Sequence, residues 1–279
     1  MGRGSSGEQP REKAMITHVS ASSLEQYERC QVQWKFRRID GLIMPPGIAA
    51  HTGRGVHKGA EVNMKAKRLS GEDEPIDVVL DAARDGYVHS LKETGLFVPR
   101  SEAGSEKTQM NDGLNATVSM AKVYREKVAP SRQPKFVEKE LYSEVKGLPV
   151  PLMGIIDLVT VDGVVSDLKT GAKKWNQGRA DNSIQATMYD GLLTDNMGKP
   201  RSIEFDIVIR NQKEPQILTT TRTEDDWGKL VMRSQAMLRG VELGAFNPTH
   251  PDNWWCSEKW CGFWHRCQYI SIRNKLTKG

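Results

Sequence analysis

The sequence has little of what membrane and secreted proteins need. Its 279 residues contain no apolar run near the roughly 18 residues of a membrane-spanning helix. No apolar segment follows the charged N-terminus, as a secretory signal would require. Cysteine is scarce, with four residues, and in a reducing compartment so few thiols point to metal binding, catalysis or burial rather than to disulfides. We therefore expect a cytoplasmic protein without membrane contact.

Charge of one sign is not in large excess either. Forty Lys and Arg residues face 35 Asp and Glu, which gives a net charge of +5 and an isoelectric point near 8.9. This mild excess suits a polyanionic partner without requiring one. The length allows a sizeable core, and we expect a single folded domain over residues 15–270. Residues 1–14 have little to bury and are predicted to be a disordered tail, with a second tail at 271–279.

The clearest local signal is a β-hairpin around Asp162-Gly163. Apolar, β-branched runs precede and follow this pair, and Asp-Gly is among the strongest hairpin signals. Side chains alternate along a strand, so Asp167 and Lys169 share one face. A two-residue loop would place Asp157 on the other face, whereas a three-residue loop with a left-handed Gly163 pairs Asp157 with Asp167.

The pairing of these two acids would create a site for a cation. Opposed residues on neighbouring strands have Cβ atoms about 5 Å apart. Asp157 and Asp167 at that spacing repel each other unless a cation lies between them. Carboxylate oxygens suit Mg²⁺ or Mn²⁺. The sequence therefore predicts a divalent-metal site on a hairpin with an odd-length loop.

The rest of the chain alternates helical and strand patterns. Helices are expected from Ser20 toward Ile39, from a Gly-rich turn at Gly53 through about Leu69, and at 77–94, 107–128, 182–194 and 224–243. Strands are expected at 135–145, 202–210 and 216–222. This order predicts an α/β fold in which helices flank a mixed central sheet.

The hairpin motif resembles that of a known family. Gly-Ile-Ile-Asp157 followed by Asp167-Leu-Lys169-Thr-Gly is similar to the PD-(D/E)XK nucleases, and specifically to their RecB-like branch. Asp rather than Glu at the variable acid, and Ile156 rather than Pro before Asp157, are both common in that branch. The resemblance implies a restriction-endonuclease-like core with a helical N-terminal region, and hydrolysis of DNA phosphodiesters.

The resemblance also implies roles for residues around the hairpin. Gly-x-x-x-His57-x-x-x-Glu61 is similar to the family's first motif, whose histidine is a further metal ligand. The implied ligands of one or two Mg²⁺ or Mn²⁺ ions are His57, Asp157, Asp167 and the backbone carbonyl of Leu168. Lys169 would orient or deprotonate the attacking water. Glu61 would orient His57 as a hydrogen-bond acceptor.

Two segments are expected to touch DNA. Gln185 and Tyr189 are four residues apart on one helix face and resemble the family's Gln-x-x-x-Tyr motif near bound DNA. After the hairpin, Lys173, Lys174 and Trp175 form a basic and aromatic loop that could hold a phosphate and stack a base. An ordinary solvated loop can have the same composition.

The cysteines are grouped as one plus three. Cys256, Cys261 and Cys267 lie in a segment with four of the seven tryptophans, while Cys30 lies far upstream. The pattern, with Ser20-x-Ser-x-Leu-x-x-Tyr-x-x-Cys30, resembles RecB-like nucleases that carry a [4Fe-4S] cluster, although their C-terminal trio is often Cys-x₂-Cys-x₅-Cys rather than Cys-x₄-Cys-x₅-Cys. It implies a cluster that clasps the two chain ends. Zinc, with His265 able to replace a cysteine, and unliganded core cysteines are the alternatives.

Taken together, the motifs imply a metal-dependent DNA exonuclease that acts in recombination, repair or end processing, in the cytoplasm of a bacterium or a phage-infected host. A CRISPR-adaptation nuclease is the alternative within this class. A non-catalytic DNA-binding or assembly module of the same fold is the alternative from another class. The chain has no Gly-x-x-x-x-Gly-Lys-Ser/Thr phosphate loop, so any unwinding would come from a partner. The expected partners are DNA and a helicase, a recombinase or a single-strand-binding protein.

Overall fold

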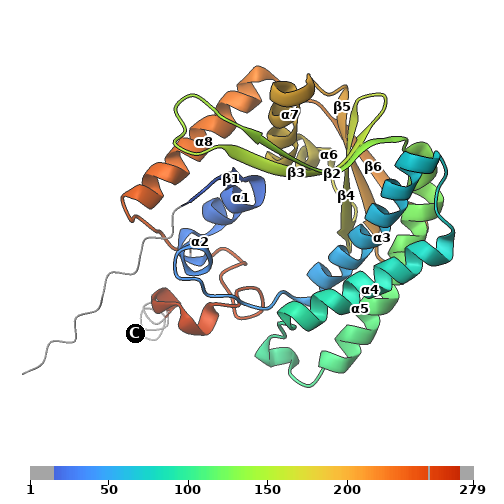
Figure 1. Cartoon of the computed structure of the whole chain (residues 1–279). Coiled ribbons are helices and arrows are strands. Elements are labelled where there is room, and N and C mark those ends of the chain that lie inside the picture. The colour runs from blue at the N-terminus through green and yellow to red at the C-terminus, as the bar shows by residue number, and fades with distance from the viewer. Residues whose placement is uncertain (1–15, 251, 271–279) are drawn as a thin grey trace, which may run out of the picture.

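The computed structural model describes residues 16–250 and 252–270 (Figure 1). Its helices are α1 (Ala21–Arg29), α2 (Gln31–Arg38), α3 (Ile48–Ser70), α4 (Ile76–Thr94), α5 (Glu106–Val123), α6 (Gln177–Asp181), α7 (Ile184–Met197) and α8 (Glu224–Glu242). Its strands are β1 (Val19–Ser20), β2 (Pro134–Ser143), β3 (Leu152–Thr160), β4 (Val164–Gly171), β5 (Ser202–Ile209) and β6 (Gln216–Thr220). The predicted tails at 1–14 and 271–279 lie outside the described residues.

The strands form one mixed sheet in the order β1-β3-β4-β5-β6, with β2 paired to β3. The pairs β2–β3, β3–β4 and β5–β6 are antiparallel, whereas β1–β3 and β4–β5 are parallel. Helices α1, α7 and α8 cover one face, and α3 and α5 cover the other (Figure 1). The prediction of a mixed central sheet flanked by helices is confirmed.

Alternating strand residues supply an apolar core on each side of the sheet. The first core joins Leu192 of α7 to Phe205 of β5. The second joins Val56 and Met64 of α3 to Leu168 of β4. Each fully buried side chain of this size contributes about 1.5–3 kcal/mol. The two cores hold α3 and α7 on opposite faces of β4, so the hairpin lies between them.

The hairpin between β3 and β4 has the three-residue loop that the sequence predicts. Leu158 pairs with Ser166 and Val159 with Val165, so residues 161–163 form the loop. Gly163 has φ +83°, the left-handed conformation that glycine adopts without strain. The odd-length loop is confirmed, and one further step along this register sets Asp157 opposite Asp167.

Helix α3 differs from its prediction at the start. The glycines near Gly53 were expected to form a turn, but Ile48–Ser70 is one continuous helix. A Cβ added at Gly55 would lie 2.8 Å from the carbonyl oxygen of Ala83, and one at Gly59 would lie 2.8 Å from that of Val79. Both distances are shorter than real contacts, so these glycines let α4 pack directly on α3. Tertiary packing, rather than a turn, explains them.

The predicted helix from Ser20 toward Ile39 is broken into α1 and α2. Ser20 caps α1 through a hydrogen bond from the backbone N–H of Ser23, but Cys30 has an extended backbone (φ −165°, ψ 107°) between the two helices. The C-terminal segment lies beside this break, as Figure 1 shows. The rings of Phe36 and Phe263 are 5.4 Å apart, and the Arg29 guanidinium lies 4.8 Å from the Trp255 ring. The two ends of the described chain therefore meet.

The other elements agree with the sequence within a few residues. Exceptions are the short β1 and α6 and the 3₁₀ turns at Arg100–Glu102, Ala129–Ser131 and Trp264–Arg266, which were not predicted. A π-helical turn at Tyr124–Val128 also follows α5. None of the helices in residues 16–250 and 252–270 is both long and apolar enough to cross a membrane.

The packing of α3 on α4 gives a first prediction. Gly55→Ala should lower the free energy of unfolding by about 1–3 kcal/mol, because the methyl group would overlap Ala83 and Thr117. Gly228→Ala is the matched control, since Gly228 lies in α8 with nothing within 4 Å of its added Cβ. It should raise stability by about 0.5–1 kcal/mol through helix propensity. Urea unfolding measures both, and an equally stable Gly55→Ala variant would contradict this packing.

Candidate active site

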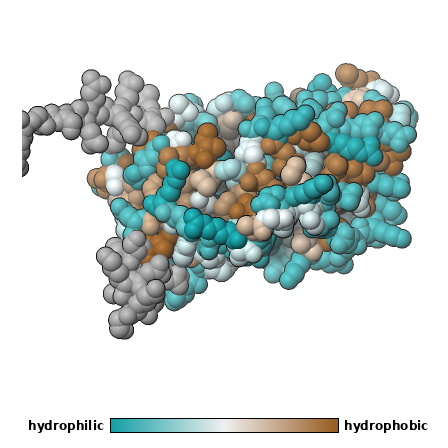
Figure 2. Space-filling model, turned by 90° about the horizontal axis from the view of Figure 1, so that it is seen from below, coloured by the Kyte–Doolittle hydropathy of each residue, from teal (hydrophilic) through white to brown (hydrophobic). Residues whose placement is uncertain are grey.

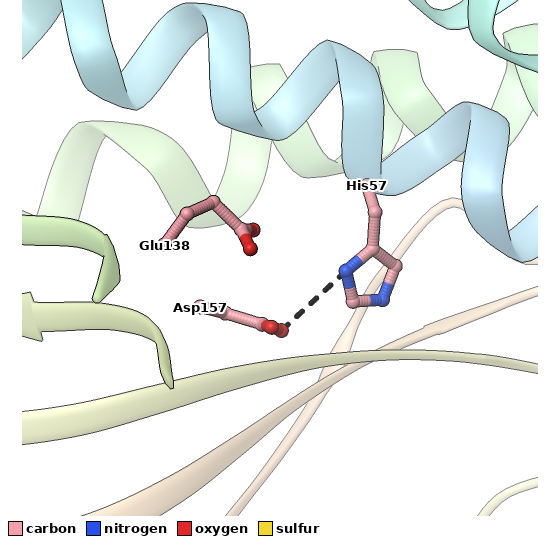
Figure 3. A group of neighbouring side chains, drawn as sticks. All are labelled: His57, Glu138 and Asp157. Atoms are coloured by element: carbon pink, nitrogen blue, oxygen red, sulfur yellow. Dashed lines mark ion pairs between the residues drawn. The ribbon is translucent and has the colours of Figure 1, made fainter. Parts of the chain in front are cut away.

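Three side chains that can bind a metal converge beneath α3. His57 comes from α3, Glu138 from β2 and Asp157 from β3 (Figure 3). One ligand atom from each lies within 4.8 Å of the other two. His57 Nδ1 is 3.5 Å from an Asp157 carboxylate oxygen. All three line a cleft of about 440 Å³ that also borders Arg54 and Lys58.

Asp157 is aimed into this cleft by the way the hairpin opens. The β3–β4 pairing reaches Leu158 and Ser166, and the next contact is different. The backbone N–H of Leu168 donates to Asp157 Oδ2 at 3.0 Å. The same carboxylate oxygen therefore accepts a hydrogen bond from the neighbouring strand and lies 3.5 Å from His57 Nδ1. The local separation of β3 from β4 creates the space for this side chain.

Glu138 is the residue that the sequence prediction missed. In the β2–β3 register it lies opposite Asp157, between the pairs Val137–Leu158 and Lys139–Ile156. Its φ of +51° is unusual for a residue other than glycine and turns the side chain into the cleft. Burial, followed by the negative charges of Asp157 and Glu61, raises its pKa to about 7. No local motif distinguishes Glu138 from the exposed Glu140 two residues later.

Asp167 and Lys169 form an ion pair next to the cleft. Lys169 Nζ lies 2.7 Å from Asp167 Oδ2, while the buried Oδ1 has no hydrogen-bond partner among the described residues. Burial raises the pKa of Asp167, and Asp157 adds to this effect. Burial opposes the charge on Lys169, but Asp167 and Asp157 outweigh it and raise the pKa of the amine. Lys169 is therefore held as an ammonium group.

Gln185 and Tyr189 lie directly behind this lysine. Lys169 Nζ donates to Gln185 Oε1 at 2.6 Å, and Gln185 Nε2 donates to the Tyr189 hydroxyl at 2.6 Å. That hydroxyl donates to the carbonyl oxygen of Ile155 on β3, also at 2.6 Å. The two residues thus fix the lysine from α7. Their contact with DNA stays a prediction.

The other predicted site residues lie near the cleft with different contacts. Glu61 forms ion pairs with Lys58 at 3.0 Å and with Lys65 at 2.5 Å. Neither contact involves His57, so the role of Glu61 in orienting His57 stays a prediction. Trp175 packs 5.3 Å from the Phe205 ring, with the Arg179 guanidinium 3.8 Å from its own ring centre. The lysines of the same loop, Lys173 and Lys174, are exposed.

The four cysteines line a single cavity of about 470 Å³ between α2 and the C-terminal segment. Burial, and then the three neighbouring thiols, raise the pKa of Cys261 to about 11. Phe263 is buried beside them, whereas Trp254 and Trp260 are 57% and 49% exposed. Figure 2, which views the protein from below, shows hydrophobic residues reaching the surface in separate patches between polar ones. Trp255, Trp260, Trp264 and Phe263 line the cavity.

Comparisons with known proteins show the family and the fold of the chain. The family model of the PD-(D/E)XK nuclease superfamily matches residues 18–268. A solved structure of a "Putative exonuclease" from Eubacterium rectale is similar with a TM-score of 0.50 and 14% identity, over 85% of each chain. A protein named SSO0001 has a TM-score of 0.39 and 13% identity, over 91% of this chain and 87% of its own. No curated protein matches the chain.

The raised pKa of Glu138 gives a second prediction. A folded-state pKa near 7, above the ordinary value of 4.5, means that stability is lost as pH rises between these two values. Without metal, Glu138→Gln should therefore melt at the same temperature as the wild type at pH 5 and at a higher temperature at pH 8. Adding Mn²⁺ at pH 8 should reverse this order, because the glutamine supplies no charged ligand.

Scanning calorimetry across this pH range measures the effect, and Glu140→Gln is the control on the exposed part of the same strand. Equal melting temperatures of wild type and Glu138→Gln at every pH would remove Glu138 from the charged cluster.

Proposed function

This chain belongs to the PD-(D/E)XK nuclease superfamily, and from that membership we propose that it is a metal-dependent DNA exonuclease of the RecB-like branch. The observation that carries the proposal is the convergence of His57, Glu138 and Asp157 within 4.8 Å, beside the ion pair of Asp167 and Lys169. Unneutralised carboxylates at this spacing favour a divalent cation. The exonuclease mode rests on the motif resemblance of the hairpin.

The residues present fit a divalent ion. His57, Glu138 and Asp157 would hold it, and Asp167, whose Oδ1 has no hydrogen-bond partner among the described residues, comes from the neighbouring strand β4. A bound Mg²⁺ or Mn²⁺ would supply Lewis acidity toward water and neutralise charge on the phosphate. Lys169, kept as an ammonium group by Asp167 and held by Gln185, would orient the water and stabilise negative charge. Its raised pKa favours these roles over proton removal.

Two other functions compete with this proposal. A CRISPR-adaptation nuclease would use the same chemistry, and a test of pathway rather than of the site distinguishes it. A non-catalytic DNA-binding module would not need the ion pair of Asp167 and Lys169 or the hydrogen bonds that hold the lysine. We place the protein in the cytoplasm, acting with a helicase, recombinase or single-strand-binding partner in recombination, repair or end processing.

We further propose that the four cysteines hold a [4Fe-4S] cluster that joins the two chain ends. All four line one cavity, and the break between α1 and α2 falls at Cys30. A zinc ion binds sulfur at about 2.3 Å, which draws four thiolates close together. These cysteines, all within the described part of the chain, form no group whose ligand atoms lie within 4.8 Å of one another. The preference for a cluster over zinc or over unliganded core cysteines therefore rests on the motif resemblance of the one-plus-three cysteine pattern.

The nuclease proposal is tested with end-labelled linear DNA and closed circular DNA in Mg²⁺ or Mn²⁺. An exonuclease digests only the linear form. Asp157→Ala, Asp167→Ala and Lys169→Ala should each lower the cleavage rate by about 10²-fold or more while largely sparing DNA binding. Asp195→Ala, at an exposed position on α7, is the control. Full activity in any of the three variants removes that residue from the mechanism, and cleavage of circles replaces the exonuclease by an endonuclease.

The cluster proposal is tested by colour, iron content and stability. Protein purified without oxygen should be brown, absorb near ~400 nm and contain about four irons per chain. Cys30→Ser should lose iron and melt at a lower temperature, because closing so long a loop costs several kcal/mol that only the intact ligand set offsets. Serine at Cys256, Cys261 or Cys267 should act alike. A colourless protein with one zinc would make the clasp a zinc site.

A further inference from the structure

Arg54 stands beside the metal ligands without a role in holding them. It lies three residues before His57 on α3, a rise of about 4.5 Å along the helix. Its side chain borders the cleft of His57 and Asp157, and also a second groove of about 820 Å³ between α3 and α4. Arg54 and Lys58 line both hollows, and Asp85 and Glu93 also line the second.

The guanidinium of Arg54 is fixed by hydroxyl groups of α4. Its NH1 group donates to Ser90 Oγ at 2.9 Å and to Thr94 Oγ1 at 3.4 Å. Thr94 in turn donates to the carbonyl oxygen of Ser90, and Ser90 Oγ lies 2.8 Å from Nδ1 of the buried His51. The supports are thus themselves held in place. An exposed arginine ordinarily samples many rotamers, whereas this one is already oriented.

The charge of Arg54 is also left without a counterion. Within residues 16–250 and 252–270, no carboxylate forms an ion pair with it, whereas Lys58 and Lys65 share Glu61. Guanidinium has five N–H donors, and the hydroxyls of α4 engage one end of the group. Arg54 is exposed and lines the cleft. An oriented and unneutralised arginine next to a metal site is suited to a phosphate.

We propose that Arg54 binds a backbone phosphate of the DNA strand adjacent to the one that is hydrolysed, and so positions the strand at the edge of the cleft. The inference rests on the proposed nuclease function, which it extends by a substrate-binding residue. A phosphate contact of this kind positions the strand without reading its sequence. Loss of this contact should therefore weaken the binding of every DNA substrate by the same factor.

The test measures binding of fluorescent single-stranded and duplex oligonucleotides by anisotropy, in Ca²⁺ and at several salt concentrations. Arg54→Gln should weaken binding by about tenfold and reduce the slope of log K against log salt by about 0.7–0.9, the value of one lost phosphate contact. In cleavage assays KM should rise by the same factor while kcat changes by less than about twofold. Arg68→Gln, on the same helix about 21 Å away, is the matched control.

Two further variants separate charge from orientation. Arg54→Lys keeps the charge and should restore the salt slope, but the affinity should stay below that of the wild type because the planar fork is lost. Ser90→Ala removes the main support and should raise KM without altering the slope. Melting temperatures identify any of the three variants, Arg54→Gln, Arg54→Lys or Ser90→Ala, that fails to fold. The other two variants then decide the outcome.

Unchanged affinity and slope in folded Arg54→Gln overturn the proposal. So does a fall in kcat at constant KM, which would place Arg54 in the chemical step. Because anisotropy needs no cleavage, failure of the two proposals can be told apart. The wild-type chain could cut no DNA while Arg54→Gln still lowers the slope of log K against log salt by about 0.7–0.9. That result would refute the nuclease proposal and support the phosphate site.

Discussion

This structure depends on one constraint, the electrostatic repulsion between carboxylates that are held close together in the cleft. Glu138 and Asp157 lie within 4.8 Å, and two unit charges at that separation repel by roughly 3 kcal/mol at an effective dielectric constant near 20. The chain keeps them there through a stiff framework. Under the sheet, the buried Arg132 binds both Glu204 and Asp206 of β5, and Ser166 of β4 donates to Asp206. These contacts tie the start of β2 to β4 and β5, so the strands cannot slide to relieve the repulsion.

Much of the site could be predicted from the sequence because the motifs that form it are local. The Asp162-Gly163 pair, with the requirement that Asp157 and Asp167 share a face, predicted the three-residue loop that the structure contains. The order of strands and helices predicted the mixed sheet. His57 came from a motif resemblance, and the structure places its ring beside Asp157.

The parts that the sequence did not predict depend on contacts between distant segments. Glu138 joins the cluster only through the register of β2 on β3 and through a backbone angle that no neighbouring residue dictates. The glycines of α3 suggested a turn, since glycine favours turns, but the carbonyl groups of α4 fill the space where side chains would be. Cys30 looked like one position within a helix, yet it occupies the break where the two chain ends meet. In each case the deciding partner is at least 19 residues away along the chain.

The unbroken helix α3 has a mechanical consequence. It carries Arg54 and His57 on one rod, and the glycines at 55 and 59 lock that rod against α4. Such a unit has no hinge between His57, which lies beside Asp157, and the exposed Arg54. Any widening of the cleft must therefore carry the helical layer as a rigid body relative to the sheet. The cleft therefore has a fixed width on the side of α3, rather than one that α3 adjusts by bending.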